Sequence, residues 1–372
     1  MLGSEFKENS IRVLHLIPHL GQGGAEAALA TLLSAPQPGI EHVVCTIIAA
    51  PHHFDVTQRV ILGAASRTSP SPSIALHLRR AIRDVRPHVL HCWMYHANLL
   101  SLASIGFGAR VLWSIHSESP NSSKALTRGI SAACARLSHF FPERVVYVAE
   151  AGRVKHEEYG YAAARGLVIP NGINTERFRP KTFRRPSGST IRLGMVARYD
   201  PSVKGHHFLI DVLAKHPLRN RLQIVFAGAG CDTAPELLDH LARTGLLGQV
   251  RLYGALTSIE LLYAELDMMI IPSYSEALPM SLLEGAAAGL VICASRVGDI
   301  PWLGLPNEVL FDPGDAHGCA SALEAALALV GAPETAIRQR SLIYPRFSAH
   351  TIARRYAELY SELVEAHRLR KC

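Results

Sequence analysis

The sequence lacks the features that mark several specialised classes of protein. Its seven cysteines are odd in number and scattered, and no C-x-x-C pair occurs, which disfavours a disulfide framework and a zinc site. No uninterrupted apolar stretch approaches the roughly 18 residues that a membrane-spanning helix needs, because serines, glycines and Arg110 interrupt the longest candidate, residues 99–113. The N-terminus carries charged residues before any apolar run, unlike a signal peptide. We therefore expect a cytoplasmic protein, soluble or peripheral to a membrane, with buried free thiols.

Acidic residues are scarce in the first half of the chain. Residues 1–185 contain 21 Lys and Arg but 12 Asp and Glu, whereas the remainder contains 17 and 19, and the net charge is +7. A basic half suits nucleic acid, an anionic membrane or phosphorylated substrates. No nucleic-acid motif accompanies the dispersed charge, so we expect no nucleic-acid partner. Residues 74–85 predict an amphipathic helix with Arg79, Arg80, Arg83 and Arg86 close together, which is either a solvated face or a membrane-surface patch.

Length and periodicity predict an α/β fold with two domains. A chain of 372 residues is consistent with two domains, and short apolar strands alternate with helices in two successive series. Such alternation is typical of two doubly wound parallel sheets. We place the first domain at residues 11–180, a basic, Pro-rich linker at 178–186, the second domain at 187–348 and a final helix at 349–372.

The segment 273–298 has the clearest signature of a ligand site. The apolar run 268–271 predicts a buried strand, Glu276 follows on a loop, and Glu284 lies in the next helix, which Pro279 introduces. Ligands of open α/β sheets bind at the carboxyl ends of the strands, and a helix N-terminus suits an anion such as a diphosphate. The alternative is that both glutamates are solvated. Because the neighbours of Glu284 are apolar or small and a buried unpaired carboxylate is costly, we favour a ligand-facing role.

Three further loops follow predicted strands. Gly23 and Gly24 lie between the strand 11–17 and an alanine-rich helix, where glycines would let backbone approach a phosphate, although an ordinary glycine turn is the alternative. His116 stands at the carboxyl end of the strand 110–115, and a structural histidine is the alternative there. The loop 198–205 follows the strand 191–196 and contains Arg198 and Lys204.

These motifs together resemble the retaining GT-B glycosyltransferases of family 4, the glycosyl transferases group 1. The residues that carry the resemblance are Gly23-Gly24-Ala25-Glu26, Ile169-Pro170-Asn171-Gly172-Ile173, Arg198 with Lys204-Gly205, and Glu276-x7-Glu284. The resemblance covers residues 11 to about 364. It implies two Rossmann-like domains facing across a cleft, with a final helix that crosses back to the first.

The resemblance also implies roles for the site residues. Arg198 and Lys204 would bind the donor diphosphate, Glu276 would lie near the transferred sugar, and Glu284 would accept hydrogen bonds from the ribose. His116 would lie near the sugar and the acceptor, and Gly23 and Gly24 would close on the diphosphate. The remaining donor contacts are expected from backbone near Gly228, Tyr253, Ala277, Leu278 and Leu282.

Two cations can stabilise a leaving diphosphate without a metal, and the sequence contains no Asp-x-Asp. We therefore expect no metal and no other cofactor. The sequence departs from the family at Ala277-Leu278, where Gly-Phe is common, which predicts a sugar pocket of different shape. The loop after Arg198 is slightly longer than in some versions, and Lys204 stays within it.

The predicted function is retaining, metal-independent transfer of a sugar from a UDP-, GDP- or ADP-linked donor to a sugar or lipid-linked acceptor. From the family resemblance we expect a role in polysaccharide or lipopolysaccharide biosynthesis. From the basic first half of the chain we expect an anionic membrane surface as a partner. Two alternatives stay open: a sugar-nucleotide epimerase or phosphorylase on the same fold, and a non-catalytic nucleotide-sugar-binding scaffold. The base, sugar, acceptor, linkage and oligomeric state are not readable from the sequence, and neither is the choice between front-side attack and double displacement.

Overall fold

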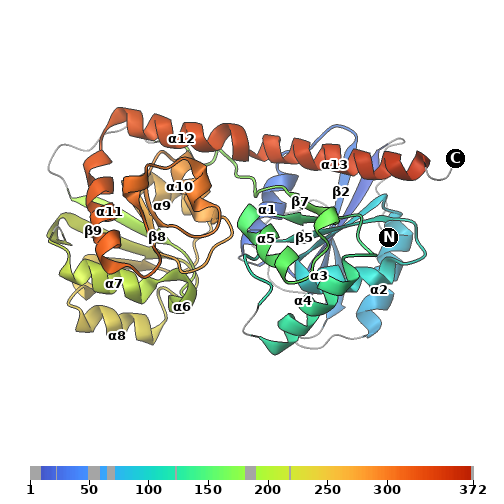
Figure 1. Ribbon diagram of the computed structural model, residues 1–372, viewed down its shortest axis with the longest axis horizontal. Coiled ribbons are helices and arrows are strands. Elements are labelled where there is room, and N and C mark those ends of the chain that lie inside the picture. Colours follow the sequence, from blue (N-terminus) through green and yellow to red (C-terminus); the bar gives the residue numbers. More distant parts are fainter. Residues whose placement is uncertain are drawn as a thin grey trace. The chain divides into compact units, whose positions relative to one another are not determined.

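A computed structural model of the protein describes residues 10–21, 23–48, 59–64, 72–121, 124–180, 190–217 and 219–369. The chain forms two compact units (Figure 1): unit 1 takes in the chain up to Gly172 and again from Ala349, and unit 2 is Ile173–Ser348. The first boundary therefore lies at residue 172, where the sequence suggested 180. The reason is local, because the backbone N–H of Ile173 donates to the carbonyl of Phe347 at the other end of unit 2.

Unit 1 is built on a seven-stranded parallel sheet of order β3-β2-β1-β4-β5-β6-β7. Its strands are β1 (Ile11–Ile17), β2 (Ile40–Ile48), β3 (Arg59–Ala64), β4 (Val89–Trp93), β5 (Arg110–Ile115), β6 (Arg144–Tyr147) and β7 (Gly166–Val168). Its helices are α1 (Gly24–Leu33), α2 (Pro72–Val85), α3 (Met94–Leu100), α4 (Ala125–Leu137), α5 (Glu150–Glu158) and α13 (Ala349–Leu369). The strand order reverses between β1 and β4, which is the switch point where a doubly wound sheet opens a crevice.

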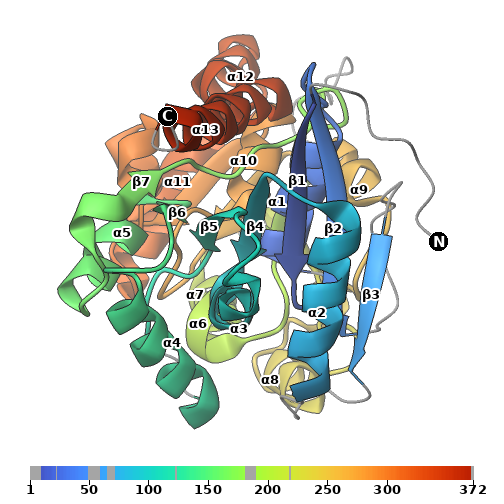
Figure 2. The ribbon, with the colours of Figure 1, turned by 90° about the vertical axis from the view of Figure 1, so that its right-hand side faces the viewer.

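The core of unit 1 lies on both faces of this sheet, as parallel sheets require. On β1, Leu14 and Leu16 belong to the core beneath α2, whereas Val13 and Ile17 belong to the core that α1 and α13 cover. Figure 2 shows the sheet of unit 1 with α2, α3 and α4 on one side of the strands and α13 on the other. The final helix therefore completes the core of unit 1.

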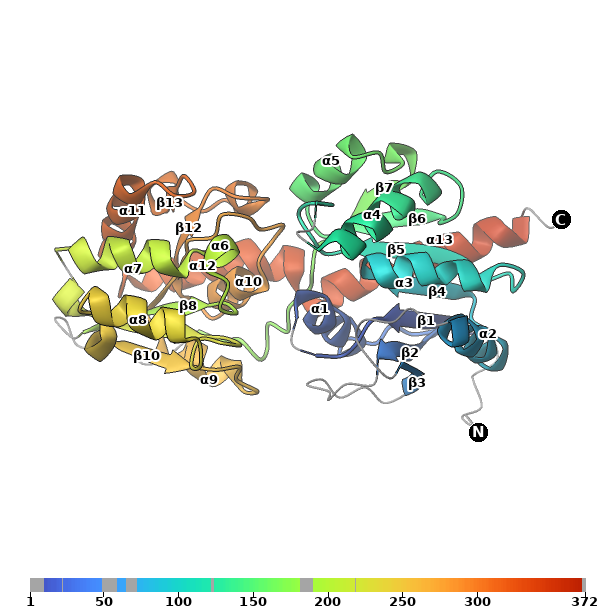
Figure 3. The same cartoon turned by 90° about the horizontal axis from the view of Figure 1, so that it is seen from below.

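Unit 2 repeats the plan with a six-stranded parallel sheet of order β10-β9-β8-β11-β12-β13. Its strands are β8 (Ile191–Val196), β9 (Leu222–Ala227), β10 (Val250–Tyr253), β11 (Met268–Ile271), β12 (Val291–Ser295) and β13 (Leu310–Phe311). Its helices are α6 (Pro201–Lys204), α7 (His206–Lys215), α8 (Pro235–Arg243), α9 (Ile259–Glu265), α10 (Met280–Ala287), α11 (Ala316–Leu329) and α12 (Pro333–Phe347). Helices α7 and α8 lie on one side of the sheet and α10 and α12 on the other (Figures 1 and 3).

The predicted α/β class with two doubly wound parallel sheets is confirmed. Sequence reasoning missed β3, α5, α12 and the short helix α6, which lies in the segment expected to be a loop. Helix α12 was hard to see because it contains Pro345 and few apolar residues in a regular pattern. The predicted linker, residues 178–186, lies mostly outside the described residues.

Six cysteines lie in the described part of the chain, and all of them are buried and free, as expected. Among the described helices, none is by itself long and apolar enough to cross a bilayer, although the strongly bent pair Ala316–Leu329 and Glu334–Phe347 passes on length and composition.

Candidate functional site

Two loops of unit 2 meet where β8 and β11 lie side by side at the switch point of the sheet. The loop after β8 ends at Gly205, and the loop after β11 begins at Pro272. Gly205 has a left-handed backbone (φ 76°), and a Cβ there would stand 2.2 Å from the carbonyl oxygen of Pro272. The N–H of Tyr274 donates to the carbonyl of Val203 at 2.8 Å. Glycine therefore lets the two loops touch through their backbones.

This contact brings together two of the predicted residues, Lys204 and Glu276. Lys204 Nζ lies 2.6 Å from Glu276 Oε1, and the hydroxyl of Ser273 donates to the same oxygen at 2.9 Å. The two side chains are only 16% and 12% exposed. A partly buried ammonium needs a counter-charge, because removing one partner of such a pair is strongly destabilising. A bound phosphate could replace Glu276 as that partner.

The loop that carries Glu276 is held from behind by the end of β12. The hydroxyl of Ser295 donates to the carbonyl of Ser273 at 2.6 Å, and the N–H of Asp299 donates to the carbonyl of Ala277 at 2.9 Å. Gly298 is left-handed (φ 54°), and a Cβ there would stand 2.1 Å from the carbonyl oxygen of Glu276. Leu278 and Leu282 are buried, so their predicted donor contacts can come only from backbone.

Glu284 lies on α10 and is bound by a residue that sequence reasoning missed. The hydroxyl of Tyr263 donates to Glu284 Oε2 at 2.9 Å. Burial raises the pKa of Glu284 to about 7, and the Tyr263 hydrogen bond and Arg177 act in the opposite direction. Part of the residue remains open, so its carboxylate can still meet a ligand. Tyr263 lies on α9, and a tyrosine on a helix gives no sequence signal that its hydroxyl binds a carboxylate.

Arg198 does not join Lys204 in this structure. Its Nη2 lies 3.2 Å from Asp200 Oδ2, and its side chain is 64% exposed. Asp200 also accepts from the N–H of Val203 and so caps α6. The predicted diphosphate contact of Arg198 requires its side chain to leave Asp200.

The structure places Gly228 and Tyr253 next to each other. The N–H of Gly228 donates to the carbonyl of Tyr253 at 3.1 Å. Gly228 is left-handed (φ 150°), and a Cβ there would stand 2.1 Å from the carbonyl oxygen of Ala197, just before Arg198. The backbone here is close-packed, which fits contacts through main-chain atoms.

His116 follows β5 in unit 1 and lies against an aromatic surface. Its ring stacks on Trp93 with centroids 5.0 Å apart. Both ring nitrogens are buried, and neither has a well-formed hydrogen bond within the described residues, although Asn171 is near. Burial lowers the pKa of His116 to about 3, and Asn171 acts in the opposite direction. At neutral pH the imidazole is therefore uncharged.

Trp93 contacts a largely buried histidine cluster that the sequence did not predict, made of His15, His42 and His91. The indole of Trp93 donates to His15 Nδ1 at 3.2 Å, and His15 Nε2 lies 2.9 Å from His42 Nδ1. His91 contacts Tyr360 on α13 at 2.8 Å and the hydroxyl of Ser114 at 2.7 Å. The available signal was His15 inside the predicted apolar strand 11–17.

The two glycines of the loop before α1, Gly23 and Gly24, have different surroundings. Gly23 caps α1 in an extended conformation, and a Cβ there would stand 2.3 Å from Glu26 Oε2. Gly24 has nothing within 4 Å of such a Cβ. Glu26 pairs with His19 Nδ1 at 3.1 Å, and burial raises the pKa of Glu26. A diphosphate at this helix terminus would therefore meet a carboxyl group.

No group of three or more His, Cys, Asp and Glu suited to a metal occurs among the described residues. The polar groups of the candidate site in unit 2 are a lysine, an arginine and carboxylates at strand ends. Such a set can neutralise a bound anion and accept hydrogen bonds from hydroxyl groups.

Two family models match the chain. The model "Glycosyltransferase Family 4" matches residues 10–177, and "Glycosyl transferases group 1" matches residues 190–328.

Among proteins of known sequence, the D-inositol 3-phosphate glycosyltransferase of Geodermatophilus obscurus is 30% identical over 204 residues, which cover 50% of this chain and 45% of that protein. The glycogen synthase of Mycobacterium tuberculosis is 27% identical over 335 residues, which cover 84% of this chain and 79% of that one. The chain thus spans less than half the length of the first relative and most of the second.

Among solved structures, Anabaena HepE in complex with UDP superposes with a TM-score of 0.79 at 19% identity, over 95% of this chain and 100% of that one. A likeness at this identity shows that the two share a fold.

Proposed function

The chain belongs to the group 1, family 4 glycosyltransferases, and we propose that it transfers a sugar from a nucleotide-sugar donor with retention of the anomeric configuration and without a metal. The observation that carries the proposal is the Lys204–Glu276 pair at the switch point of unit 2. A lysine at the carboxyl edge of a parallel sheet is placed for a diphosphate, because the charge that develops on the leaving group needs a fixed cation. HepE, which binds UDP, supports a uridine nucleotide as the first donor to test.

In the proposed reaction the donor diphosphate replaces Glu276 as the ion-pair partner of Lys204. Arg198 leaves the exposed contact with Asp200 and provides a second cation. Glu276 is then released to face the transferred sugar, and Glu284 accepts from the ribose hydroxyls. Each charge-assisted contact contributes about 1.5–3 kcal/mol.

We propose front-side attack by the acceptor hydroxyl. Its oxygen bonds to the anomeric carbon as the bond from that carbon to the phosphate oxygen breaks, and the departing phosphate takes the hydroxyl proton. His116, neutral at physiological pH, can exchange hydrogen bonds with a sugar hydroxyl but carries no proton to donate as a cation.

The membrane and the pathway are further parts of the proposal. The excess of basic residues before residue 186 suits a lipid-linked acceptor at an anionic cytoplasmic membrane face, within polysaccharide or lipopolysaccharide assembly. Binding to anionic vesicles that weakens with salt supports this part, and absence of such binding at low salt contradicts it.

The test is nucleotide release from UDP-, GDP- and ADP-sugars in the presence of a chelator. Lys204→Ala should lower turnover by roughly 10²–10³, as should Arg198→Ala, whereas Lys215→Ala, an exposed lysine on α7, should not. Product anomeric configuration by NMR tests retention. Unchanged turnover in Lys204→Ala contradicts the site, and nucleotide binding without turnover under any acceptor points to a scaffold.

A further inference from the structure

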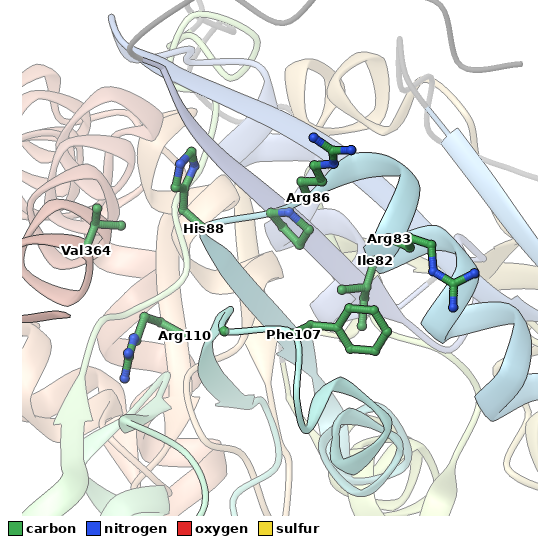
Figure 4. A pocket seen from close by; sticks show the side chains of 9 residues that line it. Ile82, Arg83, Arg86, His88, Phe107, Arg110 and Val364 are labelled. Carbon is green, nitrogen blue, oxygen red and sulfur yellow. The ribbon is translucent and has the colours of Figure 1, made fainter. Parts of the chain in front are cut away.

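A cavity of about 460 Å³ lies in unit 1. Figure 4 shows side chains that line it. His88, which lines it, directly precedes β4, and Arg110, which also lines it, begins β5. His116 follows the other end of β5. The cavity is therefore distinct from the candidate site and has no part in the proposed transfer reaction.

The polar groups of this cavity are all cationic or neutral donors. Arg83 and Arg86 stand at the exposed end of α2. Arg110 pairs with Glu143 at 2.7 Å, so its charge is shared. His88 Nδ1 accepts the backbone N–H of Arg12 at 2.9 Å, which leaves the imidazole proton on Nε2. None of the described residues that line the cavity carries a carboxylate, so its chemistry favours an anion.

The turn that presents Arg86 is unusual and is held in place. Arg86 has a left-handed backbone (φ 48°), which is uncommon for a residue with a side chain. Its carbonyl accepts from the guanidinium of Arg12 at 3.0 Å, and its N–H donates to the carbonyl of Ile82 at 2.8 Å. Backbone strain of this kind persists where surrounding contacts enforce it.

The rest of the lining is apolar, including Ile82, Phe107 and Val364. Figure 4 shows the side chains of Arg83, Arg86 and Arg110 reaching away from one another, around Ile82 and Phe107. The cations therefore stand at the rim of an apolar floor. A ligand that suits both has a charged head and an apolar body.

We propose that this cavity is a binding site for a phosphate ester that carries an apolar group. Arg83 at the rim binds the phosphate, Arg86 and Arg110 raise the positive potential around it, and the apolar group lies on Ile82, Phe107 and Val364. Both a phospholipid headgroup and a soluble phosphate ester have this chemistry.

The test uses the full chain carrying Lys204→Ala, so that phosphate binding at the donor loops is weakened. Calorimetry at constant ionic strength compares inorganic phosphate, glycerol 3-phosphate and monomeric dihexanoyl phosphatidylglycerol. The short-chain lipid should bind most tightly. Arg83→Glu should weaken it at least about tenfold, which is ~1.4 kcal/mol. Arg80→Glu makes the same charge change one turn earlier on α2, outside the lining, and should change affinity less than about twofold.

Other outcomes overturn the proposal. If Arg80→Glu and Arg83→Glu lose the same affinity for the short-chain lipid and for vesicles of phosphatidylglycerol in phosphatidylcholine, the lipid is held by general electrostatic attraction to the basic surface. Absence of binding by every phosphate probe removes the site. Glycerol 3-phosphate that binds as tightly as the lipid, or a lipid preference that survives Phe107→Ser, removes the role of the apolar floor. Sugar transfer depends on residues elsewhere, so either proposal can fail while the other stands.

Discussion

The two units share one fold but furnish the carboxyl edges of their sheets in different ways. In unit 2 the switch point carries charge, with Lys204 and Glu276 paired on adjoining loops. In unit 1 the carboxyl ends of β4 and β5 carry neutral rings, with His116 stacked on Trp93 and a histidine cluster behind them, and the Glu26–His19 pair lies after β1. The comparison teaches that a doubly wound sheet sets the place of a site and leaves its chemistry to side chains.

The largest expected difference between the two units is in how their stability changes at acidic pH. Burial lowers the pKa of His42 and His156 to about 4 and that of His116 to about 3, below the ordinary value of 6.5. Between pH 6.5 and these lowered pKa values, the three histidines are protonated in the unfolded chain but not in folded unit 1. The stability of unit 1 therefore falls as pH drops below about 6.5. On going from pH 7 to pH 5, each of the three histidines should lower the free energy of unfolding of unit 1 by on the order of 2 kcal/mol.

Unit 2 has opposing terms. Burial lowers the pKa of His206 to about 4, but it raises that of Glu284 to about 7, above its ordinary 4.5. The folded state holds the Glu284 proton longer, so this group stabilises unit 2 as pH falls from 7 toward 4.5 and offsets His206.

The described chain offers three buried free thiols in each unit, and these can report the two units separately. They are Cys45, Cys92 and Cys134 in unit 1, and Cys231, Cys293 and Cys319 in unit 2. In a urea series, thiol labelling read by mass spectrometry should detect the unit 1 thiols at lower urea concentration than the unit 2 thiols at pH 5. At pH 7 the difference between the two urea concentrations should be smaller. Simultaneous exposure at pH 5 would contradict the difference.

The glycines of the two units give the second contrast. Gly205→Ala forces a Cβ toward the carbonyl of Pro272 in a left-handed conformation, which costs about 1–3 kcal/mol and parts Lys204 from Glu276. Turnover should fall about 100-fold. Gly24→Ala, at an open position in α1, should leave the melting temperature unchanged or slightly raised. A Gly205→Ala variant that melts at the native temperature would show that the loop contact does not require glycine at 205.

The sequence made unit 2 the easier half to predict. Strands β8 and β11 were predicted at their observed bounds, and Lys204, Gly205 and Glu276 lie in the short segments directly after these strands. Strand ends at a switch point converge by topology, so spacing alone brings these residues together.

Unit 1 depends on pairings that sequence spacing does not encode. His91 meets Tyr360, which is 269 positions away, and that contact exists only because α13 returns to cover the sheet. Tyr263 was missed for a related reason, since a buried tyrosine on a helix looks the same whether or not its hydroxyl binds a carboxylate. The pairing of Arg198 with Asp200 depends on a rotamer, which residue order does not specify.

Tyr360→Phe tests whether the histidine cluster is structural. Loss of the hydroxyl leaves His91 Nδ1 without this partner in a buried setting, which should cost about 1–3 kcal/mol of stability. Donor affinity in unit 2 should not change. Tyr344→Phe, on the exposed side of α12, is the matched control. A Tyr360→Phe variant as stable as the native chain would show that the cluster contributes no stability through this bond.

Tyr263→Phe makes the smallest change and tests the carboxylate of unit 2. Removing the 2.9 Å hydrogen bond takes away a contact that lowers the pKa of Glu284, so the pKa should rise further above about 7. If the ionised carboxylate binds the ribose, donor affinity near pH 7 should fall about three- to tenfold, within the ~0.5–1.5 kcal/mol of one hydrogen bond. The loss should shrink at higher pH, where Glu284 ionises again.

The pH dependence separates this role from a packing effect. Donor dissociation constants measured from pH 6 to 9 should give a profile that shifts to higher pH in Tyr263→Phe and stays in place in Tyr344→Phe. A uniform loss of affinity across the range would mean that Tyr263 acts through its ring, which packs edge-on against Phe178 at 5.4 Å. An affinity that does not depend on pH in either protein would remove Glu284 from the donor site, and the charged edge of unit 2 would then rest on Lys204 and Glu276 alone.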